Sequence, residues 1–264
     1  MSDSDSEQKL GGDLSFDQLM KEAVALKSAQ LSRYRPKFDS WPEFHQAGLY
    51  YSNTWESLRT EGLQKQCEAF DGKKADGLKL LEEGDTQKAL YRFEEALCVF
   101  RWVESSRKNW KNEGIEDDDL TIHEAEVETE AVRSRVLSAY LNISLCCMRL
   151  DQHKDAVRAC DEVLKVDPRN VKALYRKAVS LAQPSGSDID DYKTAIKLLV
   201  IALQIDPSNA AAREKCLSYQ SFVQQQSAKS KETFGSFFRK PIVQEGDEAA
   251  KPAPVHTAKS EADE

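Results

Sequence analysis

The sequence contains no long hydrophobic run and no excess of positive charge. Its longest aliphatic stretch, "LLVIAL" at 198–203, is far shorter than the roughly 20 residues that cross a bilayer. The 264 residues carry 37 Lys and Arg against 45 Asp and Glu, a formal charge of −8. Because general binding to a phosphate backbone needs a net positive surface, we expect no nucleic-acid partner, and we expect no membrane partner either.

The cysteines lack any spacing typical of zinc ligands, and they are too sparse for a disulfide framework. There are six of them: Cys67, Cys98, Cys146, Cys147, Cys160 and Cys216. All but one lie in helical, apolar-patterned stretches, where a free cysteine behaves as a small hydrophobic residue. This usage indicates a reducing compartment. The first residues, "MSDSDSEQKLGG", have neither a basic nor an apolar region of a secretory signal, so we expect a soluble, cytoplasmic protein.

Residues that could support catalysis or hold a metal are also few. The four histidines are scattered along the chain, at His45, His123, His153 and His256. None forms a constellation with Ser, Cys or a carboxylate that suggests catalysis. The acidic run "EDDD" at 116–119 lacks EF-hand spacing and predicts a loop and a helix N-terminus. We therefore expect no cofactor, no metal and no enzymatic activity.

Helical periodicity dominates from about residue 62 to 232, and almost nothing alternates as a strand does. Three segments superimpose: "GDTQKALYRFEEAL" (84–97), "DQHKDAVRACDEVLKVDP" (151–168) and "DDYKTAIKLLVIALQIDP" (190–207). Each has a small residue (Ala89, Ala156, Ala195), then a larger one four residues on (Phe93, Cys160, Leu199), then Ala96, Val163 or Ala202. Two further small residues, Gly77 and Ser144, lie twelve residues before the first two of these positions. Small residues at such places let paired helices approach closely.

This pattern resembles tetratricopeptide repeats of about 34 residues, from roughly 70 to 209. The second repeat fits without gaps over 137–170, and the third needs extra residues that the turn-forming "AQPSGSDI" supplies. The resemblance implies an all-α fold, a right-handed solenoid of three helix-turn-helix repeats. A C-terminal helix is expected to cap the last repeat, as solenoids require, and a helical extension precedes the first.

A long insertion separates the first repeat from the second. We expect "LCVFRWVESSRKNW" to continue the second helix of repeat one, with "NEGIEDDD" as the turn that follows. Thr121 with Glu124 would then form a capping box for a long next helix. An extended helical pair of this kind between repeats one and two resembles the FKBP-type immunophilin version of the domain, here without its isomerase domain.

The sequence thus predicts a domain organisation in four parts. These are residues 1–13, disordered; 14–61, a helical N-terminal extension; 62–232, the repeat domain; and 233–264, a disordered acidic tail. Within the repeat domain the expected repeats are about 70–110, 124–170 and 171–209, with the capping helix at 210–232. The extension is expected to dock on the first repeat, or to contact a partner through the region of Trp41 and Trp55.

Four polar residues fall, by repeat register, on the concave side of the expected solenoid. Lys172 and Arg176 lie in "NVKALYRKA", Asn142 lies in "AYLNIS", and Lys74 lies three residues before Gly77. In Hop-like and immunophilin co-chaperones, matching positions form a carboxylate clamp. That clamp grips the C-terminal Glu-Glu-Val-Asp (EEVD) of a cytosolic heat-shock chaperone of the 90 or 70 kDa class.

Carried over, Lys74, Asn142 and Lys172 would hold the peptide's terminal carboxylate and Asp side chain. Arg176 would reach a side-chain carboxylate or a peptide carbonyl. The sequence departs from the family at one clamp position, because Leu78 stands where the family usually has Asn. Leucine offers no donor, so one contact to the terminal carboxylate is missing.

Other interpretations of these residues stay open. Cations at four-residue spacing most often form a solvated face or internal ion pairs, Asn142 could satisfy a backbone group, and Lys73 could replace Lys74. The protein could then be a repeat scaffold that binds a different peptide. It could also be the non-catalytic relative of a repeat-containing prolyl isomerase. That activity needs a β-sheet domain before the repeats, where this sequence is instead predicted to be helical.

Overall fold

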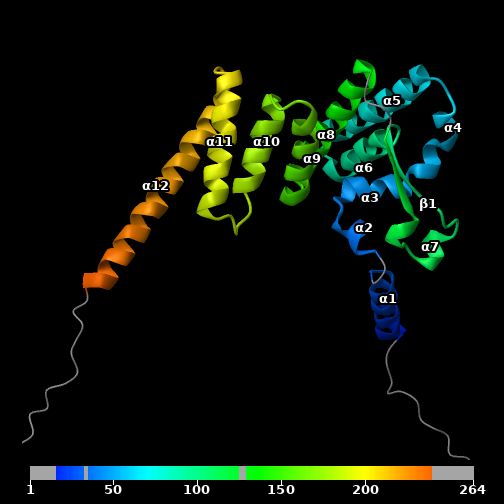
Figure 1. The fold of residues 1–264 in the computed structure, drawn as a ribbon, viewed down its shortest axis with the longest axis horizontal. Helices are drawn as coiled ribbons and strands as arrows, with labels where there is room; N and C mark the ends of the chain where they lie inside the picture. The colour runs from blue at the N-terminus through cyan, green and yellow to red at the C-terminus, as the bar shows by residue number, and fades with distance from the viewer. Residues whose placement is uncertain (1–15, 33–34, 125–128, 240–264) are drawn as a thin grey trace, which may run out of the picture. The chain divides into compact units, whose positions relative to one another are not determined.

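The computed structural model describes residues 16–32, 35–124 and 129–239 (Figure 1). The predicted disorder of residues 1–13, and that of the tail from 240, lies outside these ranges. The chain divides into two compact units, one up to Val223 and one from Gln224 onward. None of the described helices is long and apolar enough to cross a membrane.

Three pairs of helices form the centre of the first unit. The pairs are α5 (Leu63–Glu82) with α6 (Thr86–Leu97), α8 (Glu130–Arg149) with α9 (His153–Val166), and α10 (Val171–Ala182) with α11 (Ile189–Ile205). The members of each pair pack on each other, and α6 packs on α8 as α9 packs on α10. The first helices, α5, α8 and α10, also contact one another in that order. This alternation is a helical solenoid, as the sequence predicts.

Side-chain caps close the turns of the first and third pairs. The Asp85 side chain caps α6 by accepting from the backbone N–H of Lys88, just after Gly84 takes a φ of 88°. Between α10 and α11, Asp188 and Asp191 form a reciprocal capping box. Such caps satisfy backbone N–H groups that a helix start leaves unpaired. Helices α6 and α11 therefore begin at defined residues and fold back on α5 and α10.

Close approach within and between the pairs rests on the small residues. The nine repeat positions at Ala89, Ala156, Ala195, Phe93, Cys160, Leu199, Ala96, Val163 and Ala202 are all 0% exposed. Gly77 of α5 lies directly against the Phe93 ring of α6, where an added Cβ would meet Cε1 at 2.6 Å. All six cysteines are buried and free. The predicted role of the small residues is confirmed.

The insertion after the first pair differs from the predicted helix. Helix α6 ends at Leu97, and strand β1 (Arg101–Ser105) pairs antiparallel with β2 (Leu120–Glu124), so that Val103 lies opposite Ile122. A short helix, α7 (Trp110–Glu113), and a 3₁₀ turn, η2 (Asp117–Asp119), lie between the strands. The expected helix continuation and the capping box of Thr121 with Glu124 are both wrong, since these two residues lie in β2.

The hairpin forms in place of a helix because β1 packs against α3. The run from Val99 to Val103 is apolar and aromatic except for Arg101, which suits a strand as well as a buried helix. Val103 is 0% exposed because it packs against α3 at Gly48, where an added Cβ would lie 3.3 Å from Val103 Cγ2. The predicted helix N-terminus at "EDDD" is likewise wrong, because this run forms η2 and leads into β2.

The residues before α5 form short helical segments. They are α1 (Phe16–Ser32), α2 (Pro36–Ser40), α3 (Glu43–Tyr50), η1 (Ser52–Trp55) and α4 (Glu56–Arg59). Helix α3 packs on α6 and on β1. Trp55 Nε1 donates to the carbonyl of Glu95 in α6 at 2.9 Å, and Trp41 packs against a small cluster around Phe38 and Val103. From α2 onward the extension therefore packs on the first pair and its hairpin.

The last described helix is α12 (Ala210–Arg239). Its first turns cover the third pair, with Ala212, Cys216 and Tyr219 buried in a cluster that includes Leu199. The predicted capping helix is present, but it continues beyond the expected end at 232. Residues 233–239, predicted to be disordered, are helical. In the second unit, the described residues are the remainder of this helix from Gln224 to Arg239.

Candidate functional site

Each of the four predicted binding residues lies on the first helix of a pair. Lys74 belongs to α5, Asn142 to α8, and Lys172 and Arg176 to α10. Because these three helices contact in sequence, the residues lie on a connected set of elements. Lys172 and Arg176 are four residues apart, so they stand on the same face of α10, one turn from each other.

Arg176 is the residue that the structure places most closely against a neighbouring helix. Its Nη1 donates to the backbone carbonyl of Leu141 and, at 3.3 Å, to the hydroxyl of Ser144, both on α8. These acceptors lie one residue before and two residues after Asn142. The guanidinium is therefore held against the turn of α8 that contains Asn142. No described hydrogen bond or ion pair joins Lys74 to the other three residues.

Arg176 is half-buried, and no carboxylate among the described residues pairs with it. Loss of solvent lowers the pKa of its guanidinium, and the nearby charge of Arg149 acts in the same direction. Among the described residues, no Asp or Glu forms an ion pair with Arg176. Its neighbour Lys177 differs, because its Nζ lies 2.5 Å from Asp161 Oδ1. A half-buried cation that donates only to neutral oxygens retains attraction for an anion.

The two adjacent lysines of α5 are also distinguished by their partners. Lys73 Nζ lies 2.9 Å from the Glu95 carboxylate, which is itself buried. Lys74 and Lys172 make no ion pair among the residues that the structure describes. Lys73 is thus occupied inside the protein, and Lys74 is the α5 cation available to a ligand. Asn142 likewise has no described hydrogen bond through its side-chain amide.

Two further residues belong to the surroundings of this site. Leu78, four residues after Lys74 on α5, is 41% exposed and offers an apolar surface where a donor is expected. Arg149, exposed at the end of α8, is close enough to Arg176 to lower its pKa. Sequence reasoning missed Arg149, although its position two helical turns after Asn142 is a signal that could have found it.

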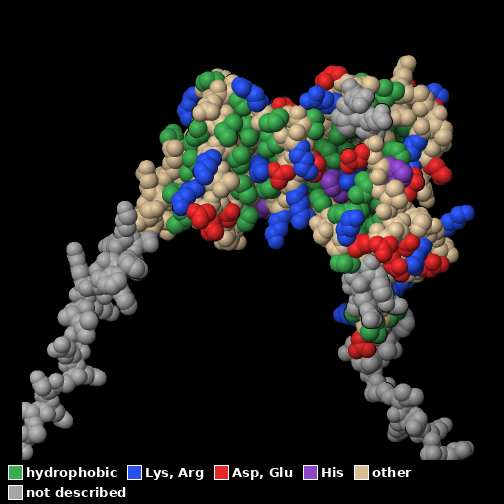
Figure 2. All heavy atoms as spheres, viewed as in Figure 1, with side chains coloured by type: hydrophobic (Ala, Val, Ile, Leu, Met, Phe, Trp, Pro, Cys, Tyr) green, Lys and Arg blue, Asp and Glu red, His purple; other side chains and the backbone are tan. Residues whose placement is uncertain are grey.

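On the face drawn in Figure 2, lysines and arginines occur among acidic side chains over the helical pairs. Basic residues on that face therefore form no single continuous patch. The candidate site is distinguished by cations that form no ion pair among the described residues, and not by a local excess of positive charge. What the arrangement offers a ligand is three cationic groups and one amide, carried on three contacting helices.

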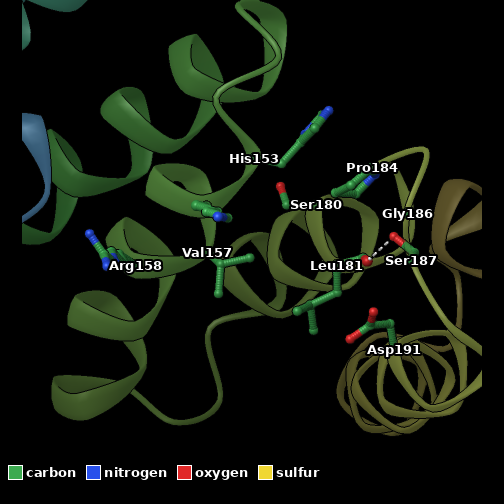
Figure 3. Close-up of a pocket in the computed structure, with 10 residues that line it drawn as sticks. His153, Val157, Arg158, Ser180, Leu181, Pro184, Gly186, Ser187 and Asp191 are labelled. Carbon is green, nitrogen blue, oxygen red and sulfur yellow. Dashed lines mark hydrogen bonds between the residues drawn. The ribbon is translucent and has the colours of Figure 1, made fainter.

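A separate cavity of about 400 Å³ lies at the C-terminal end of α10 (Figure 3). Val157, Leu181 and Pro184 supply its apolar wall, and the Ser187 hydroxyl closes one side by donating to the Leu181 carbonyl at 2.8 Å. The extra residues of the turn "AQPSGSDI" form this edge. None of the four predicted binding residues lines the cavity, so it is distinct from the candidate site.

The contacts and buried positions of the three helical pairs define a solenoid of paired helices that resembles a tetratricopeptide-repeat domain. No family model matches the chain. A curated relative, FK506-binding protein 59 of Drosophila melanogaster, is 28% identical over 111 residues. The match covers 42% of this chain and 24% of the relative, so the chain spans about a quarter of the length of that protein.

Two solved structures also resemble the chain. One is the C-terminal tetratricopeptide-containing domain of a Plasmodium falciparum FK506-binding protein, with 18% identity and a TM-score of 0.49, covering 65% of this chain and 99% of that one. The other is the Hsp90 co-chaperone Cns1 of Saccharomyces cerevisiae, with 20% identity and a TM-score of 0.49, covering 67% and 46%.

Proposed function

We propose that the protein is a peptide-binding tetratricopeptide adaptor, a co-chaperone that acts in the cytoplasm and performs no catalysis itself. Its ligand is the acidic, EEVD-type C-terminus of a heat-shock chaperone of the 90 or 70 kDa class. The binding residues are Lys74, Asn142, Lys172 and Arg176. The observation that carries the proposal is the half-buried Arg176 guanidinium, held against the turn of α8 that contains Asn142 and without a carboxylate partner among the described residues.

The chemistry of a chain terminus suits these donors. A C-terminal aspartate presents two carboxylates close together, and charge-assisted hydrogen bonds to ionised groups are stronger than neutral ones. In a partly desolvated site each contributes about 1.5–3 kcal/mol, compared with about 0–1 kcal/mol for an ion pair on an open surface. Lys74, Asn142 and Lys172 would hold the terminal carboxylate and the Asp side chain.

Leu78 supports an alternative within the same class of function. Because it is exposed and offers no hydrogen-bond donor, it would contact an apolar side chain better than a carboxylate. The groove would then belong to a scaffold that binds a different partner peptide. The two functions differ in whether a free terminal carboxylate is required.

Alanine variants test the proposed binding residues. We expect Lys172→Ala and Arg176→Ala each to weaken binding of a Met-Glu-Glu-Val-Asp peptide at least tenfold, about 1.4 kcal/mol, in isothermal titration calorimetry. Lys88→Ala is the matched control, because Lys88 on α6 is exposed and, among the described residues, pairs with Asp85 of its own helix turn. Equal affinity of all three variants and the unsubstituted protein would refute the assignment of the site.

A further inference from the structure

Two adjacent glutamates of α6 are equally buried but differently partnered. Glu94 and Glu95 are each 5% exposed. Glu95 lies 2.9 Å from Lys73 Nζ and 2.7 Å from Arg92 Nη1. The Glu94 carboxylate has no hydrogen bond or ion pair among the described residues, although a buried carboxylate normally has one. The Glu94 carboxylate is therefore buried, and no cation among the described residues pairs with it.

The surroundings of Glu94 are acidic. Glu43 of α3 and Asp155 of α9 are the charged groups that act on it most strongly, and both are negative. Burial, assisted by these two acids, raises the pKa of Glu94 to about 8. On α6 itself, the charge of Arg92 is already directed to Glu95. Of the two acids, Glu43 lines the same cavity as Glu94, whereas Asp155 is paired with Arg158.

Glu94 faces an open cavity of about 280 Å³ between α3 and α6, which lie side by side in Figure 1. Three tyrosines share its wall, Tyr50 and Tyr51 from α3 and the turn after it, and Tyr91 from α6. Tyr50 is 53% and Tyr91 48% exposed, so these rings are accessible from solvent. Glu94 lines the same cavity, so a group bound there would lie beside its carboxylate.

We propose that this tyrosine-lined cavity binds the side-chain ammonium group of a lysine carried by a partner protein. Glu43 supplies charge that attracts the ammonium, Glu94 loses its proton as the ammonium binds beside it, and the tyrosine rings supply faces that attract a cation through their π electrons. The aliphatic stem of lysine would pack on the rings. The site is separate from the proposed peptide site on α5, α8 and α10, and it does not depend on whether that site binds a chaperone.

A titration monitored by the NMR signals of labelled tyrosine rings tests this proposal. The probes are Nα-acetyl-lysine methylamide, its Nε-trimethyl form and the neutral norleucine equivalent. We expect saturable shifts of Tyr50, Tyr51 and Tyr91 with the two cationic probes and none with norleucine. Whichever cationic probe binds more tightly identifies unmodified or methylated lysine as the preferred ligand.

Variants separate binding from general structural change. Glu94→Gln keeps the size of the side chain and should weaken the cationic probes at least tenfold. Tyr91→Ala, at an exposed position, should weaken them several-fold. Glu83→Gln is the matched control, because Glu83 is exposed at the end of α5 and does not line the cavity. Equal shifts from norleucine, or unchanged affinity in Glu94→Gln, would overturn the proposal.

Discussion

The contact between Gly77 and Phe93 permits a test of how closely the first pair of helices must pack. A methyl group at Gly77 would lie 2.6 Å from Cε1 and 2.8 Å from Cζ of the Phe93 ring. Normal carbon contacts are about 3.5–4.0 Å, so the ring must move by about 1 Å. Phe93 is 0% exposed and belongs to the main core cluster.

Overpacking of this kind costs about 1–3 kcal/mol, and the higher helix propensity of alanine offsets about 1 kcal/mol of that cost. We therefore expect Gly77→Ala to lower the free energy of unfolding by up to about 2 kcal/mol. Gly72→Ala is the matched control on the same helix, because nothing lies within 4 Å of its added Cβ. It should stabilise the protein by about 0.5–1 kcal/mol.

Urea denaturation of both variants, followed by circular dichroism, measures the difference. The Phe93→Leu background adds a second check, since removal of the ring should reduce the cost of Gly77→Ala and leave the effect of Gly72→Ala unchanged. If Gly77→Ala proved as stable as Gly72→Ala, the close approach of α5 and α6 at Gly77 would be refuted.

Two further predictions concern buried titratable groups. Burial, together with the positive charges of Arg101, Lys165 and Arg158, lowers the pKa of His45 from 6.5 to about 3. The neutral ring therefore contributes stability above pH 6.5 that is lost as the pH falls toward 3, at about 1.4 kcal/mol per pH unit. His45→Gln should flatten this acid dependence in denaturation at pH 4.5 and 7, and parallel curves would contradict it. For Glu94 the sign is opposite, because its pKa is raised from 4.5 to about 8. Stability is present below pH 4.5 and is lost as the pH rises toward 8, so Glu94→Gln should stabilise the protein by more at pH 8 than at pH 5. A constant difference between the two pH values would show that Glu94 keeps its ordinary pKa.

The repeats could be predicted from sequence because their packing is periodic. Ala89, Phe93 and Ala96 recur at fixed spacing in the later repeats, and burial of every such position follows from one rule. The hairpin could not be predicted in the same way. A short apolar and aromatic run fits a buried helix as well as a strand, and contact with α3 at Gly48, distant in sequence, decides between them.

The ion-pair partners of the charged residues could not be predicted from the sequence either. Lys73 and Lys74 are equivalent by composition, and only the position of Glu95 on α6 shows that Lys73 is occupied. In the same way, Glu94 and Glu95 differ only in what the folded chain places beside them. Long-range contacts determine which of two adjacent like charges remains available to a ligand.

The proposed function depends on recognition of a free chain terminus by Lys74, Asn142, Lys172 and Arg176. Calorimetry with Met-Glu-Glu-Val-Asp and Ile-Glu-Glu-Val-Asp peptides, each with a free or an amidated C-terminus, tests this most directly. Amidation removes one carboxylate and leaves the remaining side chains intact. We predict micromolar binding of at least one free peptide and no measurable binding of its amidated form. Equal affinity for the free and amidated forms would contradict the proposal.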